Sequence, residues 1–314
     1  MCGIAGYIGK KPLENKNISS CLTAMHHRGP DANGHQYHSR NACNIHLLHT
    51  RLAILDLDNR SAQPFQYQNS LIVFNGEIYN YIEIRTELEL LGLSFGTSGD
   101  TEVVAAALET WGDDAYLKFE GMWAMAHLNL SSMTLTLSRD RFGEKPFYIF
   151  EDEGGLYFSS EINSLSAIAD KKFKVNQNHL KRYLVNGYKA LHKTKETFFH
   201  EISSLEKASL MQIDINFHKT KKLYWDFQNS LNIEHDMSFA EAVDGTRDRL
   251  IQSMSLRTRS DVPLAFCMSG GIDSNSLISI AKRELGYDVH GFTLMSKDQR
   301  YEEDELVEKS VREL

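Results

Sequence analysis

The chain opens with Met1-Cys2-Gly3-Ile4-Ala5-Gly6, and the second position of this stretch decides how the rest is interpreted. Removal of Met1 is favourable because the side chain that follows it is small. It would leave Cys2 with a thiol and a free α-amine on one residue. The unperturbed pKa is about 7.7 to 8.0 for an α-amine and about 8.5 for a thiol, so each group holds its proton loosely at neutral pH. This terminus predicts a nucleophile that carries its own base. The alternative is a thiol without a chemical role.

Length and composition favour a two-domain enzyme. At roughly 100 to 200 residues per domain, 314 residues suggest two domains, each large enough to bury a core. The net charge of -8 argues against a nucleic-acid partner. Cys2, Cys21, Cys43 and Cys267 lack CxxC spacing, which favours a reducing cytoplasm. We expect neither secretion nor a membrane partner, because the sequence shows no signal-like start and no run of about 18 apolar residues.

Short apolar segments in the first two thirds of the chain have the β-branched and aromatic content of strands. They lie at residues 3–8, 45–55, 71–74, 122–129, 133–139, 147–150 and 156–159. Helices are predicted at 79–91 and at 101–111, the second after the capping sequence Ser98-Gly99-Asp100. This order of strands and helices favours an α+β first domain with packed sheets.

The chain becomes polar and irregular over residues 216–238, which we interpret as the linker between domains 2–215 and 239–314. The second domain is predicted to run through helix 239–257, strand 261–268, helix 275–285, strand 289–294 and helix 302–313. Strand, glycine turn, helix and strand form one βαβ unit of a parallel sheet. Such a unit alone does not cover both faces of a parallel sheet, so we expect this α/β domain to be truncated.

The glycine turn of that unit reads Ser269-Gly270-Gly271-Ile272-Asp273-Ser274. Glycines let the backbone approach a ligand, and the serines with the first helical amides offer donors to an anion such as pyrophosphate. Asp273 offers a carboxylate for Mg²⁺. The turn lacks the lysine of an ordinary P-loop. The alternative is a glycine turn that only precedes a helix.

Polar residues of the first domain sit where packing does not require them. Arg51 lies within an otherwise apolar strand, Asn75-Gly76-Glu77 follows an apolar run, and Asp100 follows Ser98-Gly99. With Cys2 they suggest an α-amino-acid site: a guanidinium for a carboxylate, carboxylates for an ammonium, and a donor pair for an oxyanion. Each has an alternative. Arg51 would face solvent on an edge strand, Asn75-Gly76 would form a hairpin turn, and Asp100 would be a helix N-cap.

The motifs along the chain resemble those of glutamine-hydrolysing asparagine synthetases. They are, in order, Met1-Cys2-Gly3-Ile4-Ala5-Gly6, His27-Arg28-Gly29-Pro30-Asp31, Arg51-Leu52-Ala53-Ile54, Asn75-Gly76-Glu77-Ile78-Tyr79-Asn80, Gly99-Asp100-Thr101-Glu102, Arg139-Asp140-Arg141-Phe142-Gly143 and Ser269-Gly270-Gly271-Ile272-Asp273-Ser274. The resemblance implies a class II glutamine amidotransferase domain, an N-terminal-nucleophile hydrolase with an αββα sandwich. It implies that the start of an ATP-pyrophosphatase domain follows.

The resemblance also assigns roles in the first domain. Cys2 would attack the side-chain amide of glutamine and form a thioester, while Asn75 and Gly76 stabilise the oxyanion. Arg51 would bind the α-carboxylate, and Glu77 with Asp100 would bind the α-ammonium. Further glutamine contacts are expected from the backbone of Leu52, Ala53, Ile54 and Leu55.

In the second domain the resemblance implies ATP and Mg²⁺. ATP would adenylate a carboxylate, by default aspartate, and ammonia would then give asparagine, AMP and pyrophosphate. The nucleotide-binding residues expected are Met268, Ser269, Gly270, Gly271, Asp273, Ser274 and Leu294, with Asp273 also as metal ligand. Met268 and Leu294 have the alternative of being core strand residues. A homodimer is one candidate assembly.

Three other interpretations stay open. Relatives amidate other carboxylates, such as sugar acids in polysaccharide biosynthesis, so aspartate is a default acceptor. In a second interpretation the chain has the same fold but is a glutamine-binding regulatory protein without catalytic activity. Retention of Cys2, Arg51, Asn75 and Asp100 argues against this interpretation. The third is a metal site built from the histidines His26, His27, His35, His38, His46 and His49, which turn and strand neighbours disfavour.

Overall fold

The computed structural model describes residues 1–193, 196–231, 237–294 and 303–314. The chain divides into two compact units, Met1–Leu231 and Asn232–Leu314, which are described here one at a time.

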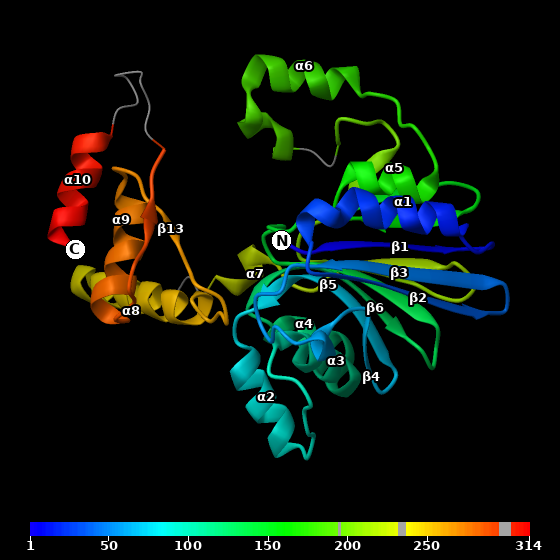
Figure 1. Ribbon diagram of the computed structural model, residues 1–314, viewed down its shortest axis with the longest axis horizontal. Helices are drawn as coiled ribbons and strands as arrows, with labels where there is room; N and C mark the ends of the chain where they lie inside the picture. Colours follow the sequence, from blue (N-terminus) through cyan, green and yellow to red (C-terminus); the bar gives the residue numbers. More distant parts are fainter. Residues whose placement is uncertain (194–195, 232–236, 295–302) are drawn as a thin grey trace. The chain divides into compact units, whose positions relative to one another are not determined.

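Unit 1 contains two antiparallel sheets that face each other (Figure 1). The first has the order β10 (Ile202–Ser204), β8 (Tyr148–Glu151), β9 (Gly155–Ser159), β1 (Gly3–Gly9), β3 (Cys43–Arg51) and β2 (Ala32–Arg40). The second has the order β12 (Lys219–Leu223), β11 (Ser209–Ile213), β7 (Thr134–Arg139), β6 (Gly121–Asn129), β5 (Ser70–Ile78) and β4 (Phe65–Tyr67).

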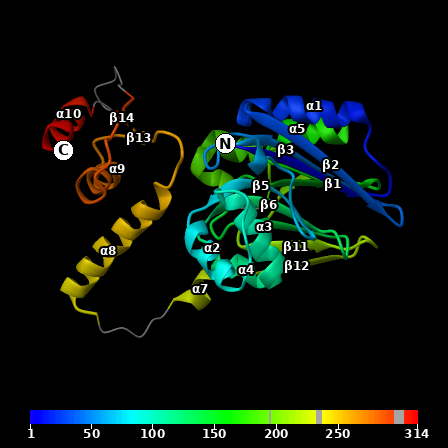
Figure 2. The same ribbon diagram turned by 60° about the horizontal axis from the view of Figure 1, so that its bottom comes forward.

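Helices cover the outer face of each sheet, so unit 1 has four layers (Figures 1 and 2). On the first sheet lie α1 (Asn15–Met25) and α5 (Ile162–Ala169). On the second lie α2 (Tyr81–Leu90), α3 (Asp100–Trp111) and α4 (Ala115–Lys118). The αββα sandwich expected from the sequence is therefore confirmed.

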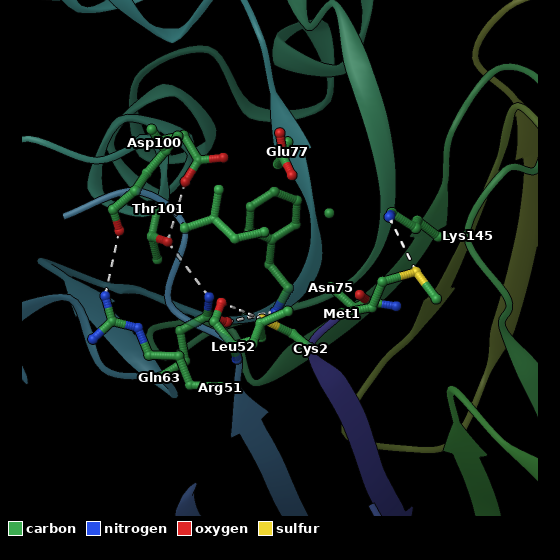
Figure 3. Close-up of a pocket in the computed structure, with 14 residues that line it drawn as sticks. Met1, Cys2, Arg51, Leu52, Gln63, Asn75, Glu77, Asp100, Thr101 and Lys145 are labelled. Atoms are coloured by element: carbon green, nitrogen blue, oxygen red, sulfur yellow. Dashed lines mark hydrogen bonds between the residues drawn. The ribbon is translucent and has the colours of Figure 1, made fainter. Parts of the chain in front are cut away.

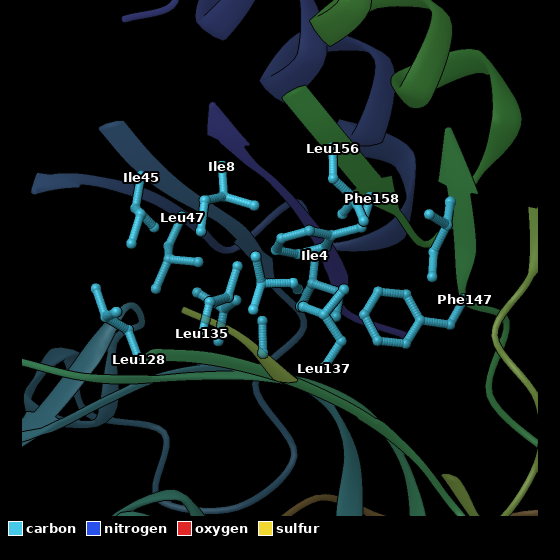
Figure 4. Close-up of a cluster of buried hydrophobic side chains, with 14 of the residues drawn as sticks. Ile4, Ile8, Ile45, Leu47, Leu128, Leu135, Leu137, Phe147, Leu156 and Phe158 are labelled. Carbon is cyan, nitrogen blue, oxygen red and sulfur yellow. The ribbon is translucent and has the colours of Figure 1, made fainter. Parts of the chain in front are cut away.

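Alternating side chains of the strands fill the spaces between these layers. In β1, Ile4 and Ile8 join the core between the sheets, while Ala5 and Tyr7 join the core under the helices. Successive residues of a strand point to opposite faces, so one strand serves both cores. The core between the sheets draws on both of them, with Leu47 from the first and Leu137 from the second (Figure 4).

The strand register brings the chain start to the end of β3. Gly3 pairs with Thr50 in the antiparallel ladder between β1 and β3. Cys2 therefore lies beside the segment that follows Arg51, although 50 positions separate Cys2 from Leu52 in the sequence.

The strands and helices predicted for unit 1 are present, with two strand ends that differ and several elements that were not predicted. The strand predicted to end at residue 74 continues as β5 to Ile78. The strand predicted to reach residue 55 ends at Arg51, because the backbone turns there to make a loop. The sequence did not indicate α1, β2, β4, α4, α5, β10, β11, β12, or helix α6 (Gln177–Asn186) with the 3-10 turn Tyr188–Lys193 after it. Most of these are short or carry a polar face, so their apolar pattern is weak.

Part of the segment predicted as an irregular linker is ordered, which corrects that prediction. Within residues 216–238, β12 (Lys219–Leu223) pairs with β11, and a short helix α7 (Phe227–Ser230) follows. All five residues of β12 are exposed and three are lysines. Charged edge strands of this kind lack an apolar pattern because they need none.

Unit 2 begins with α8 (Phe239–Arg257), whose N-terminus has a capping box between Ser238 and Glu241. A parallel pair, β13 (Phe266–Cys267) and β14 (Gly291–Phe292), is connected through α9 (Ile272–Ser279) and a π-helical turn (Ile280–Glu284). The parallel βαβ unit is as predicted, with strands shorter than residues 261–268 and 289–294. Helix α10 (Asp304–Glu313) ends the chain; the predicted start at residue 302 lies outside the described residues.

Within the described residues, no helix has the length and apolar character needed to cross a membrane.

Candidate active site

A cavity in unit 1 collects residues from the chain start, the end of β3, the middle of β5 and the first turn of α3 (Figure 3). Its lining consists of Met1, Cys2, Arg51, Leu52, Ile54, Leu55, Gln63, Phe74, Asn75, Gly76, Glu77, Asp100, Thr101 and Lys145. All the glutamine-site residues predicted from the sequence line this cavity except Ala53. The Ala53 N–H instead donates to Asp31 Oδ2 at 2.8 Å, which ties the loop to the His27–Asp31 motif.

The Cys2 thiol lies against the backbone at the end of β3. Its Sγ accepts from the Leu52 N–H at 3.3 Å. Burial raises the pKa of the thiol, and the hydrogen bond from Leu52 opposes that effect only in part. A thiol in this environment keeps its proton at neutral pH, so attack through sulfur requires a neighbouring base.

The N-terminal amine is the nearest base to that thiol in the sequence. In this structure the amine belongs to Met1, and the nitrogen of Cys2 is part of a peptide bond. Burial lowers the pKa of the Met1 amine, and the cations Arg28 and Lys145 lower it further. The pocket therefore favours a neutral amine, which is the form that accepts a proton.

Arg28 anchors the backbone of the nucleophile. It lies in a 3-10 turn (His26–Arg28), is 9% exposed, and donates from Nε to the Cys2 carbonyl at 2.9 Å. Its Nη1 donates to Glu161 Oε1 at 2.8 Å. The sequence contained the signal for Arg28 in the motif His27-Arg28-Gly29-Pro30-Asp31, but nothing there indicated its contact with Cys2.

Asn75 and Gly76 lie inside β5, so the alternative of a hairpin turn is wrong. Among the described residues, the buried Asn75 Nδ2 has no hydrogen-bond partner. A Cβ on Gly76 would come within 2.1 Å of the Met122 carbonyl oxygen, so no larger residue fits there without movement of β6. A buried amide donor without an acceptor is costly unless a ligand supplies one.

Two carboxylates form the acidic end of the cavity. Asp100 is the first residue of α3, whose N-cap is Gly99, so the alternative in which Asp100 only caps that helix is wrong. Its Oδ2 accepts from the Ile78 N–H at 3.0 Å. Burial, with the nearby charge of Glu77, raises the pKa of Asp100 to about 7. Burial also raises the pKa of Glu77. Two desolvated carboxyl groups favour the binding of a cation.

Arg51 is buried in β3, which lies between β1 and β2 and is not an edge strand, so the alternative of a solvent-facing arginine is wrong. Its Nη1 donates to the Asp58 carbonyl at 2.7 Å, and its Nη2 donates to the carbonyls of Leu55, at 3.4 Å, and Asp56. The guanidinium thereby holds the loop that forms one wall of the cavity. The sequence indicated a cation here, but not this use of its donors.

Gln63, Thr101 and Lys145 also line the cavity and were not predicted. Gln63 Oε1 accepts from the Phe74 N–H at 2.6 Å, and its Nε2 donates to Thr101 Oγ1 at 3.4 Å. Gln63 therefore bridges the cavity wall of β5 to helix α3. The only available signal for Lys145 was its place two residues after the motif that ends at Gly143.

The glycine turn of unit 2 is held by its own serines. Ser269 Oγ and Ser274 Oγ lie 2.9 Å apart, and the Gly271 N–H donates to Ser269 Oγ at 3.2 Å. The Gly270 N–H donates to a carboxylate oxygen of Glu303 at 2.7 Å. The turn thus already receives an anionic oxygen at a backbone amide, and this chemistry fits a phosphate group.

The other nucleotide residues predicted from the sequence lie around this turn. Met268 is buried ahead of it, and Asp273 lies in the first turn of α9. Leu294 is 99% exposed after β14, so the alternative of a core residue is wrong for Leu294 and fits Met268. Across the described part of the chain, no group of three or more histidine, cysteine or carboxylate side chains is placed to hold a metal ion.

Two protein families match separate parts of the chain. Residues 1–225 match the glutamine amidotransferase domain family, and residues 245–314 match the asparagine synthase family. Glutamine-hydrolysing asparagine synthetase 1 of Bacillus subtilis is 32% identical over 309 residues, covering 93% of this chain and 47% of that protein. The amidase chyE of Penicillium rubens is 30% identical over 293 residues, covering 88% of this chain and 42% of that protein.

The chain spans about half the length of such curated relatives. Among solved structures, glutamine phosphoribosylpyrophosphate amidotransferase of Bacillus subtilis is 16% identical and matches with a TM-score of 0.52, covering 95% of this chain and 67% of that one. At this identity the likeness shows the fold.

Proposed function

The chain belongs to the glutamine amidotransferase domain family, and we propose that unit 1 hydrolyses glutamine and supplies ammonia for an ATP-dependent amide synthesis. The observation that carries the proposal is the arrangement of the cavity. A thiol held by the Leu52 N–H shares it with a buried amide donor, Asn75 Nδ2, which has no partner among the described residues.

In the proposed reaction, Met1 is first removed, so that the amine belongs to Cys2. Cys2 Sγ attacks the side-chain amide carbon of glutamine while the thiol proton passes to that amine. Asn75 Nδ2 and the Gly76 N–H donate to the oxyanion of the tetrahedral intermediate. The intermediate collapses as the amine returns the proton to the leaving nitrogen, which departs as ammonia. Water then hydrolyses the γ-glutamyl thioester to glutamate.

The acidic end of the cavity supports binding of the glutamine α-ammonium. A cation between Glu77 and Asp100 would favour both ionised carboxylates, whose pKa values are raised by burial. The α-carboxylate would lie toward Arg51, which also holds the loop carbonyls of Leu55 and Asp58. The backbone of residues 52–55 would complete the site. Ala53 would contribute by holding the loop in place through its hydrogen bond to Asp31.

For unit 2 we propose that the turn Ser269–Ser274 binds the pyrophosphate part of ATP and that Asp273 contacts Mg²⁺, which would neutralise phosphate charge. Met268 and Leu294 would lie beside the adenosine. ATP would activate a carboxylate as an acyl-adenylate, and ammonia would displace AMP to give an amide. Aspartate, which gives asparagine, is the proposed acceptor because of the match over residues 245–314.

A second acceptor class has some support. The similar amidase chyE has a name that does not specify aspartate, so another carboxylate, such as a sugar acid, is the runner-up acceptor. Cytoplasmic location and a homodimer remain part of the proposal. The regulatory alternative without catalysis is disfavoured because the cavity lined by Cys2 also holds the Asn75 amide, which has no partner among the described residues.

The test uses the purified chain, whose intact mass first establishes whether Met1 is absent. We expect glutamate and ammonia from glutamine, and loss of this activity in Cys2→Ala. Substitution of the exposed Cys267 by alanine is the matched control and is expected to leave glutamine hydrolysis unchanged. Retained Met1, or glutaminase activity that survives Cys2→Ala, would contradict the mechanism.

A further inference from the structure

Lys145 is a buried cation in the cavity that the proposed reaction does not yet use. Only 7% of the surface of Lys145 is exposed. Among the described residues no carboxylate lies within 4.0 Å of its Nζ, and its side-chain hydrogen bond goes to Met1 Sδ at 3.6 Å. A thioether is a weak acceptor, and burying a charge without an ion pair is costly. Such a group in a cleft is a candidate for a functional role.

The backbone holds Lys145 at this place. The buried carboxylate of Asp140 accepts from the Lys145 N–H at 3.1 Å and from the N–H groups of Phe142 and Glu144. The Lys145 carbonyl accepts from Arg139 Nε at 2.7 Å. Both peptide groups of the residue are therefore fixed, and the turn from 140 to 145 directs the side chain into the cavity (Figure 3).

The charges that face the N-terminus come from several elements. Arg28 and Lys145 are cations that disfavour a protonated amine there, whereas Asp31 and an ionised Cys2 favour it. Burial lowers the pKa of Lys145, whereas the charges of Glu77 and of an ionised Cys2 raise it. Arg28 already has two acceptors, the Cys2 carbonyl and Glu161. Among the described residues Lys145 forms no ion pair, and Glu77 acts on it through its charge alone.

We propose that Lys145 is a positioning residue of the glutamine site: its buried ammonium disfavours a second positive charge on the Cys2 amine and keeps that amine in its basic, neutral form. Excision of Met1 would remove the side chain that contacts Lys145 Nζ and would place the new amine on Cys2, which lines the same cavity as Lys145. The same ammonium favours an ionised sulfur as Cys2 loses its proton. The inference rests on the proposed glutamine hydrolysis.

The test compares Lys145→Gln, which removes the charge, with Lys145→Arg, which keeps it. Lys172→Gln is the matched control, since Lys172 is exposed and its loss changes net charge equally. The charge of Lys145 also lowers the pKa of Glu77, so a change in activity alone would not report on the amine. The Cys2 amine is therefore titrated directly by NMR in chains labelled with 15N-cysteine. Glutamine hydrolysis is followed over the same pH range.

We expect the pKa of the amine to rise by about one unit in Lys145→Gln, since removal of a nearby like charge favours the protonated amine by about that much. The acid limb of kcat/KM should move by the same amount, a loss of about tenfold below it. Lys145→Arg should restore the amine pKa to near the unsubstituted value, and Lys172→Gln should not change it.

An amine pKa that is unchanged in a folded Lys145→Gln variant would overturn the inference, even if activity fell. If Lys145→Gln does not fold, Lys145→Met, which keeps the aliphatic stem, takes its place with the same expectation. Failure of the unsubstituted chain to hydrolyse glutamine would overturn the proposed function. The amine titration would still decide the role of Lys145, so the two failures are distinguishable.

Discussion

Asp100→Asn is expected to stabilise unit 1 at alkaline pH while it weakens glutamine binding. Burial, with the charge of Glu77, raises the pKa of Asp100 from 3.8 to about 7. Between these values the folded chain keeps a proton that the unfolded chain has released. The free energy of unfolding therefore falls as pH rises from 3.8 to about 7, and the penalty stays in place above that.

The size of this effect follows from the titration range. About two pH units lie between pH 5 and the pKa of Asp100, and each unit corresponds to 1.36 kcal/mol, so the penalty grows by about 2.7 kcal/mol at most. Asparagine has nearly the same shape and still accepts from the Ile78 N–H, but it carries no charge. The stability advantage of Asp100→Asn should thus increase by about 2 to 3 kcal/mol between pH 5 and pH 8.

The assay is urea unfolding at pH 5 and pH 8, followed by tryptophan fluorescence. Trp111, Trp123 and Trp225 all belong to unit 1, so the signal reports this unit. Asp114→Asn is the control, because Asp114 is exposed. An advantage of Asp100→Asn that is the same at both pH values would refute the assignment of a raised pKa.

The catalytic readout separates stability from binding. An ionised Asp100 is needed to hold the α-ammonium, so the KM for glutamine in the unsubstituted chain should rise as pH falls below about 7. In Asp100→Asn the KM should be high at every pH tested, with kcat less affected. A normal KM in a folded Asp100→Asn variant would exclude this carboxylate from substrate binding.

Two further substitutions test the nucleophile and its surroundings. Asn75→Ala should lower kcat by about 100- to 1,000-fold, or about 2.7 to 4 kcal/mol, since it removes one oxyanion donor; unchanged steady-state kcat in a folded variant would contradict that role. Glu161→Gln should lower the free energy of unfolding by about 1 to 3 kcal/mol, because the buried Arg28 keeps only a weaker, neutral partner. Glu161→Gln should also lower kcat, because Arg28 anchors the Cys2 carbonyl. Urea unfolding measures the change in stability, and glutamine hydrolysis measures the change in kcat. A loss of stability without a loss of kcat would show that the contact of Arg28 with Cys2 is only structural.

Much of the fold could be predicted because local patterns mark its elements. The apolar run at 122–129 and the helix at 101–111, which follows the capping sequence Ser98-Gly99-Asp100, can be recognised without tertiary information. The charged edge strand β12 has no apolar run, and the helix α1 carries its few buried residues, Ile18, Cys21 and Met25, in a mostly polar sequence. The sequence therefore placed a linker where the chain adds a strand to the sheet.

The candidate site divides in the same way. Cys2, Asn75 and Asp100 stand in short motifs whose residue types already indicate their chemistry, so the sequence alone determined which groups to consider. The tertiary structure decided what each group touches. In the folded chain Arg51 donates to loop carbonyls and Arg28 donates to the Cys2 carbonyl. Lys145 lies in the cavity without an ion pair among the described residues. Desolvation and charge proximity depend on residues that are distant in sequence, and for that physical reason only the folded chain shows a raised pKa at Asp100 and a buried cation at Lys145.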